Sequence, residues 1–232
     1  MAYEVLLFLA LASIITGNMP AINYPVRERE MRAALLSRLA LRSAQGQVAV
    51  VREEVPVGRA RIDVLALSDC LEGFELKSDF DSLTRLERQV QCFSSTLDKV
   101  TLVVGHEHLV HARQFIPKWW GVLLAERARA GGIRFEQVRE PAENPADVLL
   151  GLAGLLWRNE LLDVFERLTG REPPKSASAE ELRRKIAASS SANAVRAIVM
   201  RRLQDVERLV AWEAAQPSRP VCKIRFAGSL RC

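Results

Sequence analysis

The sequence predicts an α/β domain with a mixed sheet, followed by a helical C-terminal region. Three observations support this class. Residues 26–138 alternate between stretches of helical periodicity and short strand-like stretches, in the order α-β-β-β-α-β and then further α and β. Beyond residue 141 the periodicity is helical. The chain has 232 residues, 49% of them hydrophobic, which is enough for one such domain and a smaller appendage.

The first half of the expected domain is a helix followed by three strands. Over residues 26–42, Leu35, Leu36 and Leu39 recur at helical spacing among charged residues, which predicts an amphipathic helix. Three short extended segments follow, separated by turns at residues 56–58 and 68–72, and they should form an antiparallel meander. These strands are expected over residues 48–54, 59–67 and 73–78.

The second half of the domain is expected to alternate helix and strand. Asp81 or Ser82 is suited to cap a helix that runs to about Leu97. An apolar strand, a helix that ends before Pro117, and two strands joined by a glycine turn should follow. Their expected ranges are 100–104, 107–116, 121–125 and 133–138.

The C-terminal region is expected to be helical. Helices are predicted over residues 147–168, 179–188 and 194–214, and Ser178 with Glu181 forms a capping box before the second of them. We therefore divide the chain into an apolar N-terminal extension (1–23), the α/β domain (24–141), a helical basic region (142–214) and a tail (215–232).

Basic residues concentrate near the C-terminus. Residues 171–232 contain 13 Lys+Arg and 6 Asp+Glu, a net charge of +7, so the total of +5 leaves −2 for the preceding residues. Such a distribution is typical of an appendage that binds a polyanion, although a solvated helix face gives the same count.

The N-terminus and the cysteines bear on location. Residues 5–15 form an apolar run that is too short to span a bilayer as a helix, and Glu4 precedes it in place of a basic residue. The run is interpreted first as a buried or partner-facing helix, second as an extension before a true start at Met19 or Met31, and last as a membrane anchor. The four cysteines form no C-x-x-C pair. We expect a cytoplasmic protein without stable membrane association.

A potential metal-binding and catalytic cluster lies on the meander. In residues 73–77 (GFELK), the period of two places Glu75 and Lys77 on one face of a strand. A hairpin turn centred on Asp69 would place Asp63 directly opposite Glu75. Two carboxylates that face each other repel, so a divalent cation between them would explain the pair. Mg²⁺ or Mn²⁺ held there, with the Leu76 carbonyl as a further ligand, would suit phosphodiester hydrolysis.

These residues resemble the PD-(D/E)XK nucleases, whose fold is restriction-endonuclease-like with an α-β-β-β-α-β core. The similarity covers about residues 28–105 and rests on GRARIDV, GFELKSDFDSL and KVTLVVG, with PKWWGV beyond it. More narrowly, these runs resemble a bacterial and phage-associated branch of that superfamily. Asp63 follows Ile62 rather than a proline, which that superfamily tolerates.

The resemblance implies roles for the site residues. Asp63 and Glu75 would hold Mg²⁺, and Lys77 would orient or deprotonate the attacking water. A glutamate of the first helix would complete the metal shell, with Glu30 chosen first and Glu28 second. Gln89 would bind the substrate phosphate or orient the catalytic pair, with Gln91 as its competitor.

Other residues are candidates for nucleic-acid contact. Arg85 and Arg88, on the helix of Gln89, could contact phosphates. Arg183, Arg184 and Lys185 lie in a stretch that loosely resembles two-helix DNA-binding modules of the SAP type and would supply salt-dependent affinity.

Three further signals have ordinary structural explanations. His106, His108 and His111 have no accompanying ligands at zinc spacing and are expected to cap and cover a helix. Asp79 and Asp81 are expected in a turn and a cap, although either could reach the site. Trp119 and Trp120 are expected in the core rather than stacking on bases.

The sequence thus predicts a Mg²⁺-dependent nuclease that acts on nucleic acid, DNA in preference to RNA. The alternatives are a non-catalytic protein that binds nucleic acid or a partner with the same fold, and a membrane-tethered effector. The oligomeric state stays open, with a homodimer as one alternative.

Overall fold

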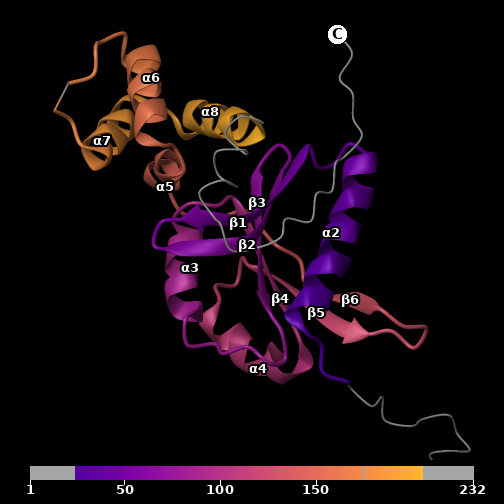
Figure 1. The fold of residues 1–232 in the computed structure, drawn as a ribbon. Helices are drawn as coiled ribbons and strands as arrows, with labels where there is room; N and C mark the ends of the chain where they lie inside the picture. Colours follow the sequence, from indigo (N-terminus) through magenta and orange to yellow (C-terminus); the bar gives the residue numbers. More distant parts are fainter. Residues whose placement is uncertain (1–23, 175, 206–232) are drawn as a thin grey trace, which may run out of the picture.

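The computed structural model describes residues 24–174 and 176–205. Its centre is a six-stranded mixed sheet in the order β1-β2-β3-β4-β5-β6 (Figure 1). Pairing is antiparallel from β1 to β3, parallel from β3 to β5, and antiparallel between β5 and β6. The strands are β1 (Val50–Val57), β2 (Ala60–Leu67), β3 (Leu71–Lys77), β4 (Lys99–Val104), β5 (Gly121–Arg127) and β6 (Ile133–Arg139).

Helices cover both faces of this sheet. The α2 helix packs on one face through Met31, Leu35 and Leu39, against Phe74 and Leu76 of β3. The α3 helix packs on the other face, where Phe93 joins a second apolar cluster. The helices of this α/β part are α2 (Glu28–Ala44), α3 (Leu86–Ser94) and α4 (His106–Phe115).

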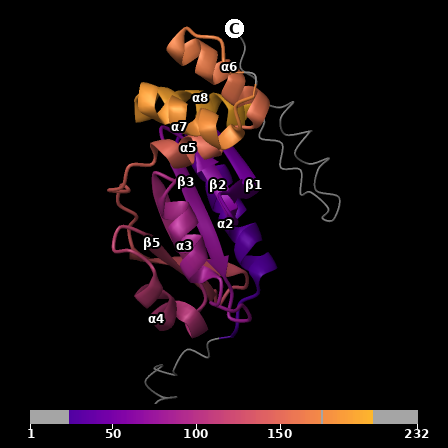
Figure 2. The same cartoon turned by 90° about the vertical axis from the view of Figure 1, so that its left-hand side faces the viewer.

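The C-terminal helices gather at one end of the sheet, and α4 lies toward the other end (Figure 2). They share the apolar cluster of α3, because Leu152, Leu161 and Val199 belong to it. The Arg196 guanidinium also pairs with Asp98 at 2.7 Å, which ties α8 to the start of β4. These helices are α5 (Leu149–Gly154), α6 (Arg158–Thr169), α7 (Ala179–Ser189) and α8 (Ala192–Gln204).

The register that the sequence predicts for the central hairpin is confirmed. Val64 pairs with Phe74 and Leu67 with Leu71, which is the symmetric arrangement about Asp69. In the continuation of this register, Asp63 is the residue opposite Glu75. The hairpin therefore brings the two predicted carboxylates to neighbouring strands.

Two predicted helix boundaries are wrong. The helix expected to begin after Asp81 or Ser82 begins at Leu86, because the Asp81 carboxylate accepts hydrogen bonds from the amide and hydroxyl of Ser78 and closes a turn instead. The helix expected over 147–168 is two helices. The Glu160 carboxylate accepts the Trp157 amide hydrogen bond, so a new helix with its own cap starts there.

Further predictions differ in detail or fall outside the described residues. The first turn begins at Gly58 (φ +61°), and Pro56 lies within β1, where an edge strand tolerates the missing amide hydrogen. The hydroxyl of Ser191 caps α8, which ends at Gln204. The apolar run 5–15, the rest of the helix expected to residue 214, and the tail lie outside the described ranges. Within those ranges, no helix combines the length and apolar character needed to cross a membrane.

We expect Gly151 to be indispensable for the packing of α5. A Cβ atom there would lie 2.0 Å from the Ser95 carbonyl oxygen, whereas one at Gly154 would meet nothing within 4 Å. Gly151→Ala should therefore lower the free energy of unfolding by about 1–3 kcal/mol. Gly154→Ala, the matched control in the same helix, should leave it unchanged or raise it by up to about 1 kcal/mol. Urea denaturation of both variants measures this, and equal stabilities would contradict the packing.

Candidate active site

The centre of the site is the buried carboxylate of Glu75 on β3. Period-two alternation sends Phe74 and Leu76 toward α2, so Glu75 and Lys77 face α3. The Lys77 Nζ atom donates to Glu75 Oε1 at 2.6 Å, and the Gln89 side-chain amide of α3 donates to the same oxygen. All three side chains are buried, and Glu75 is 1% exposed. The sequence placed these three residues together, and the structure brings them into contact.

Within residues 24–174 and 176–205, one oxygen of Glu75 finds no hydrogen-bond partner. That oxygen, Glu75 Oε2, is buried and unsatisfied, as is the Oε1 atom of Gln89. The pKa of the Glu75 carboxyl is raised to about 8, chiefly by burial and then by the charge of the nearby Asp63, while Lys77 opposes the shift. A buried polar atom without a partner is costly, and such atoms often mark a position that a ligand completes.

Asp63 joins this cluster to a second one on the α2 side. It lies at the end of the β2–β3 ladder, where its Oδ2 atom accepts the Leu76 amide at 2.8 Å. Its Oδ1 atom accepts the Arg32 guanidinium at 2.8 Å. The amide and carbonyl of one strand residue point to the same side, so the Leu76 carbonyl, the predicted backbone ligand, also points toward β2.

The second cluster is a triad of carboxylates with an arginine among them. One carboxylate oxygen from each of Glu28, Glu54 and Asp63 lies within 4.8 Å of the others. The Arg32 guanidinium contacts all three, at 2.7, 2.9 and 2.8 Å, and reaches Glu53 at 3.4 Å. Burial works against its charge, but the carboxylates, Asp63 foremost, outweigh burial and raise the pKa of Arg32 above its ordinary value. Glu75 lies outside this triad.

The backbone of β1 is strained at the triad. Glu54 has a φ of +56°, which side chains other than glycine rarely adopt. It lies between the pairs Glu53–Val64 and Val55–Ile62, so it faces Asp63 in this register. Residues held in such conformations cost on the order of 1–3 kcal/mol and cluster at functional sites.

The triad is rich in carboxylate oxygens. Four carboxylates, those of Glu28, Glu53, Glu54 and Asp63, contact the Arg32 guanidinium, and Glu54 also contacts Arg61 at 2.7 Å. Hard divalent cations such as Mg²⁺ prefer oxygen donors of this kind, so these residues fit a divalent cation.

The first-choice helix glutamate, Glu30, does not lie with Asp63 in the structure. Its carboxylate pairs with Arg127 of β5 at 2.8 Å and accepts the Arg27 amide as part of the α2 cap. Residues 28 and 30 lie about 200° apart around a helix, so only one of them can face Asp63. Glu28, the second choice, is the one that does.

Two residues of the site were missed by the sequence analysis. Arg32 lies four residues after Glu28, and therefore on the same helix face. Glu54 lies opposite Asp63 if the β1–β2 hairpin turns at Gly58 and Arg59. Both signals are present in the sequence, and a register for the first hairpin would have revealed Glu54.

The remaining candidates on α3 are separated by burial. Gln89 is buried against Glu75, whereas Gln91 is exposed, so the choice of Gln89 over Gln91 agrees with the structure. Arg88 on α3 and Arg85, the residue just before this helix, are exposed, and phosphate contact by them stays a prediction.

Asp79 and Asp81 have structural roles. Asp79 accepts the amides of Val26 and Glu107 and so fixes the starts of α2 and α4. Asp81 closes the turn at Ser78 by accepting its amide and hydroxyl hydrogen bonds.

The histidines and tryptophans also pack as expected. His106 contacts Glu126, and His108 contacts the Asp81 carbonyl, both at 2.7 Å. Trp120 is fully buried and stacks on Phe93, with Trp119 against its edge.

The basic residues of α7 pair with acids of their own helix. Arg184 and Lys185 contact Glu180 and Glu181 at 3.2 and 2.7 Å, and Arg183 lies 3.7 Å from Glu180. Such pairs are weak and can exchange for phosphates, so nucleic-acid contact by these residues stays a prediction.

The pKa of Glu75 makes stability depend on pH. The folded chain keeps a proton that the unfolded chain releases near the ordinary value of 4.5, so stability should fall as pH rises toward about 8, by up to about 1.4 kcal/mol per pH unit. Glu75→Gln mimics the protonated carboxyl and should remove this slope. Urea denaturation in chelator at pH 6 and pH 9 measures it, and an unchanged slope in the variant would contradict the assignment.

Fold and site together define an α/β protein with a carboxylate-rich site beside a buried glutamate, lysine and glutamine. The chain belongs to the family described as Bacteriophage P4 protein cII, which matches residues 23–220. Protein cII of Enterobacteria phage P4 is 27% identical over 143 residues, 61% of this chain and 54% of that protein. The chain thus spans about half the length of this relative.

One solved structure is also similar. It is a protein of unknown function from Silicibacter pomeroyi, with 19% identity, a TM-score of 0.32, and coverage of 72% of this chain and 85% of that one.

Proposed function

We propose that this protein is a Mg²⁺-dependent nuclease of the PD-(D/E)XK kind that hydrolyses phosphodiester bonds, with DNA in preference to RNA as its substrate. The observation that carries the proposal is the unsatisfied, buried Glu75 Oε2 atom beside Asp63. Asp63 and Glu75, with the Leu76 carbonyl, would hold the cation. Bound there, Mg²⁺ would polarise the phosphoryl group and lower the pKa of a water.

The other side chains have roles that follow from their contacts. Lys77 lies against Glu75, where it can orient the attacking water or offset charge on the phosphoryl oxygens. Gln89 holds the Glu75 carboxylate from α3 and so fixes its orientation. Glu28 and Glu54 add negative charge around Asp63 and favour a cation there.

The order of elements supports the same proposal. The described chain runs α2-β1-β2-β3-α3-β4, with a meander followed by a crossover helix to a parallel strand. This is the order expected of a restriction-endonuclease-like core, and the Asp and the E-x-K motif lie on its second and third strands.

One observation favours a second candidate function. Arg32 supplies a positive charge within the triad, and an arginine can replace a metal ion there structurally. The protein would then bind nucleic acid or a partner without cleaving it.

Incubation with labelled nucleic acids separates the two candidates. Single- and double-stranded DNA and RNA are each exposed to the protein with Mg²⁺, Mn²⁺ or chelator. The nuclease proposal expects cleavage with metal only, and its loss in Lys77→Ala with retained affinity for the substrate. Lys99→Ala, at the opposite end of the parallel strands, is the control and should cleave normally. Binding without cleavage under every condition would favour the second function.

A further inference from the structure

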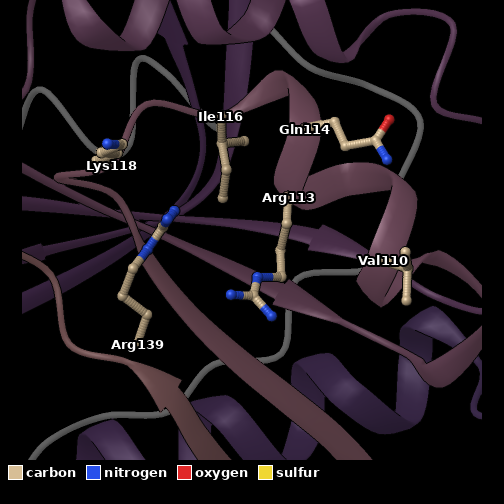
Figure 3. Close-up of a pocket in the computed structure, with 6 residues that line it drawn as sticks. All are labelled: Val110, Arg113, Gln114, Ile116, Lys118 and Arg139. Atoms are coloured by element: carbon tan, nitrogen blue, oxygen red, sulfur yellow. The ribbon is translucent and has the colours of Figure 1, made fainter.

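A basic pocket lies away from the candidate active site. It has a volume of about 540 Å³ and is lined by residues of α4, the following loop and β6, among them Arg113, Lys118 and Arg139 (Figure 3). The pocket flanks the start of β5, whereas Lys77 ends β3. Because β3, β4 and β5 are parallel, the pocket and the site belong to opposite ends of these strands.

Arg139 is fixed in this pocket by the backbone. Its Nε atom donates to the Trp120 carbonyl at 2.6 Å and one terminal nitrogen donates to the Pro117 carbonyl at 3.0 Å. These bonds use only part of the five donors of a guanidinium. The group is thus held in place with donors left for a ligand.

Among the described residues, the other two cations have no charged partner. No ion pair or hydrogen bond joins the Arg113 or Lys118 side chain to another residue of ranges 24–174 and 176–205. The six described lining residues include no acid. Burial, and then the charge of Arg113, lower the pKa of Arg139, so the two guanidinium groups repel each other. Figure 3 shows both beside the space below Ile116.

We propose that this pocket binds a phosphate group, carried by a nucleotide or by the end of a nucleic-acid strand. A phosphate would relieve the repulsion between Arg113 and Arg139 and accept the donors that they have free. The buried side chain of Ile116 and the exposed Val110 add apolar surface for the group that carries the phosphate. A volume of this size exceeds one phosphate and lies within the range of small-ligand sites.

Calorimetric titration tests the pocket. The probes are sodium pyrophosphate, ATP in chelator, and a short oligonucleotide with either a 5′-phosphate or a 5′-hydroxyl. The double variant Arg113→Glu/Lys118→Glu should lower the affinity for the bound probes about tenfold or more, because it reverses two exposed charges and leaves the Arg139 bonds intact. Arg129→Glu, an exposed cation in the β5–β6 turn, is the matched control and should change it less than about twofold.

The arms distinguish the two sources of phosphate. If ATP binds more tightly than pyrophosphate, the ligand of the pocket is a free nucleotide. If the 5′-phosphorylated oligonucleotide binds more tightly than the 5′-hydroxyl one, the ligand is the end of a strand. An equal loss in the Arg129→Glu control, or no binding of any probe, would overturn the proposal. Circular dichroism of each variant checks that it folds. The inference does not depend on nuclease activity, because Lys77→Ala should abolish cleavage and leave pyrophosphate binding unchanged.

Discussion

Replacement of Asp63 by asparagine is expected to lower the rate of metal-dependent cleavage by about 10³-fold or more. Asp63 lies between the two clusters: its carboxylate accepts the Leu76 amide and the Arg32 guanidinium, and its charge acts on the neighbouring Glu75. Asparagine keeps the size of the side chain but removes the negative charge that a divalent cation requires. The single-turnover rate at saturating Mg²⁺ measures the loss.

Asp69→Asn provides the matched control for this variant. Asp69 is exposed in the turn between β2 and β3, so the same chemical change should leave the rate unaltered. Circular dichroism and urea denaturation establish that Asp63→Asn is folded. A folded Asp63→Asn protein that cleaves at the wild-type rate would show that the metal, if any, is held elsewhere.

Removal of the Arg32 charge is expected to make the fold depend on divalent ions. Arg32 is 13% exposed and contacts four carboxylates, so Arg32→Gln leaves their repulsion uncompensated. In chelator the variant should lose on the order of 3 kcal/mol of unfolding free energy. Mg²⁺ or Mn²⁺ should restore much of this loss, because a cation that binds the folded chain stabilises it by mass action.

The control for this experiment lies on the same helix. Arg38 is exposed on α2, and Arg38→Gln should change stability by less than about 0.5 kcal/mol with or without metal. Thermal unfolding in chelator and at several Mn²⁺ concentrations gives both values. If Arg32→Gln is destabilised equally in chelator and in Mn²⁺, the triad does not bind a cation and the second candidate function gains support.

The strand half of the site could be predicted because its information is local. Alternation along residues 73–77 places Glu75 and Lys77 on one face, and a symmetric turn fixes which residue lies opposite Glu75. The observed pairing of β2 with β3 agrees with this symmetric turn. The role of Gln89 could be predicted because α3 is the helix that directly follows β3. The hydrogen bond from Gln89 to Glu75 is present in the structure.

The helix half of the site was harder to predict, because it depends on how α2 rotates against the sheet. The sequence favoured Glu30 over Glu28, and only the docking of Met31 and Leu35 turns Glu28 toward Asp63. The register of the first hairpin places Glu54 opposite Asp63, but no propensity indicates the positive φ that Glu54 adopts there. The place of Arg32 among the carboxylates follows only when both of these are known.

The early start predicted for α3 failed for a related reason. Asp81 has the chemistry of a helix cap, yet it satisfies the amide and hydroxyl of Ser78 in a turn instead. Side chains that cap helices also stabilise turns, and sequence alone does not choose between the two. Tertiary contacts decided the outcome here, since the neighbouring Asp79 holds the starts of α2 and α4.

Anomalous diffraction from crystals soaked in Mn²⁺ locates a bound cation directly. The proposed mechanism predicts one strong peak bonded to carboxylate oxygens of both Asp63 and Glu75, the latter through its now unsatisfied Oε2 atom. The contradicting result would be a crystal soaked in saturating Mn²⁺ that shows no peak at these two carboxylates and leaves Arg32 in its present contacts. That result would exclude a metal-dependent active site at this position.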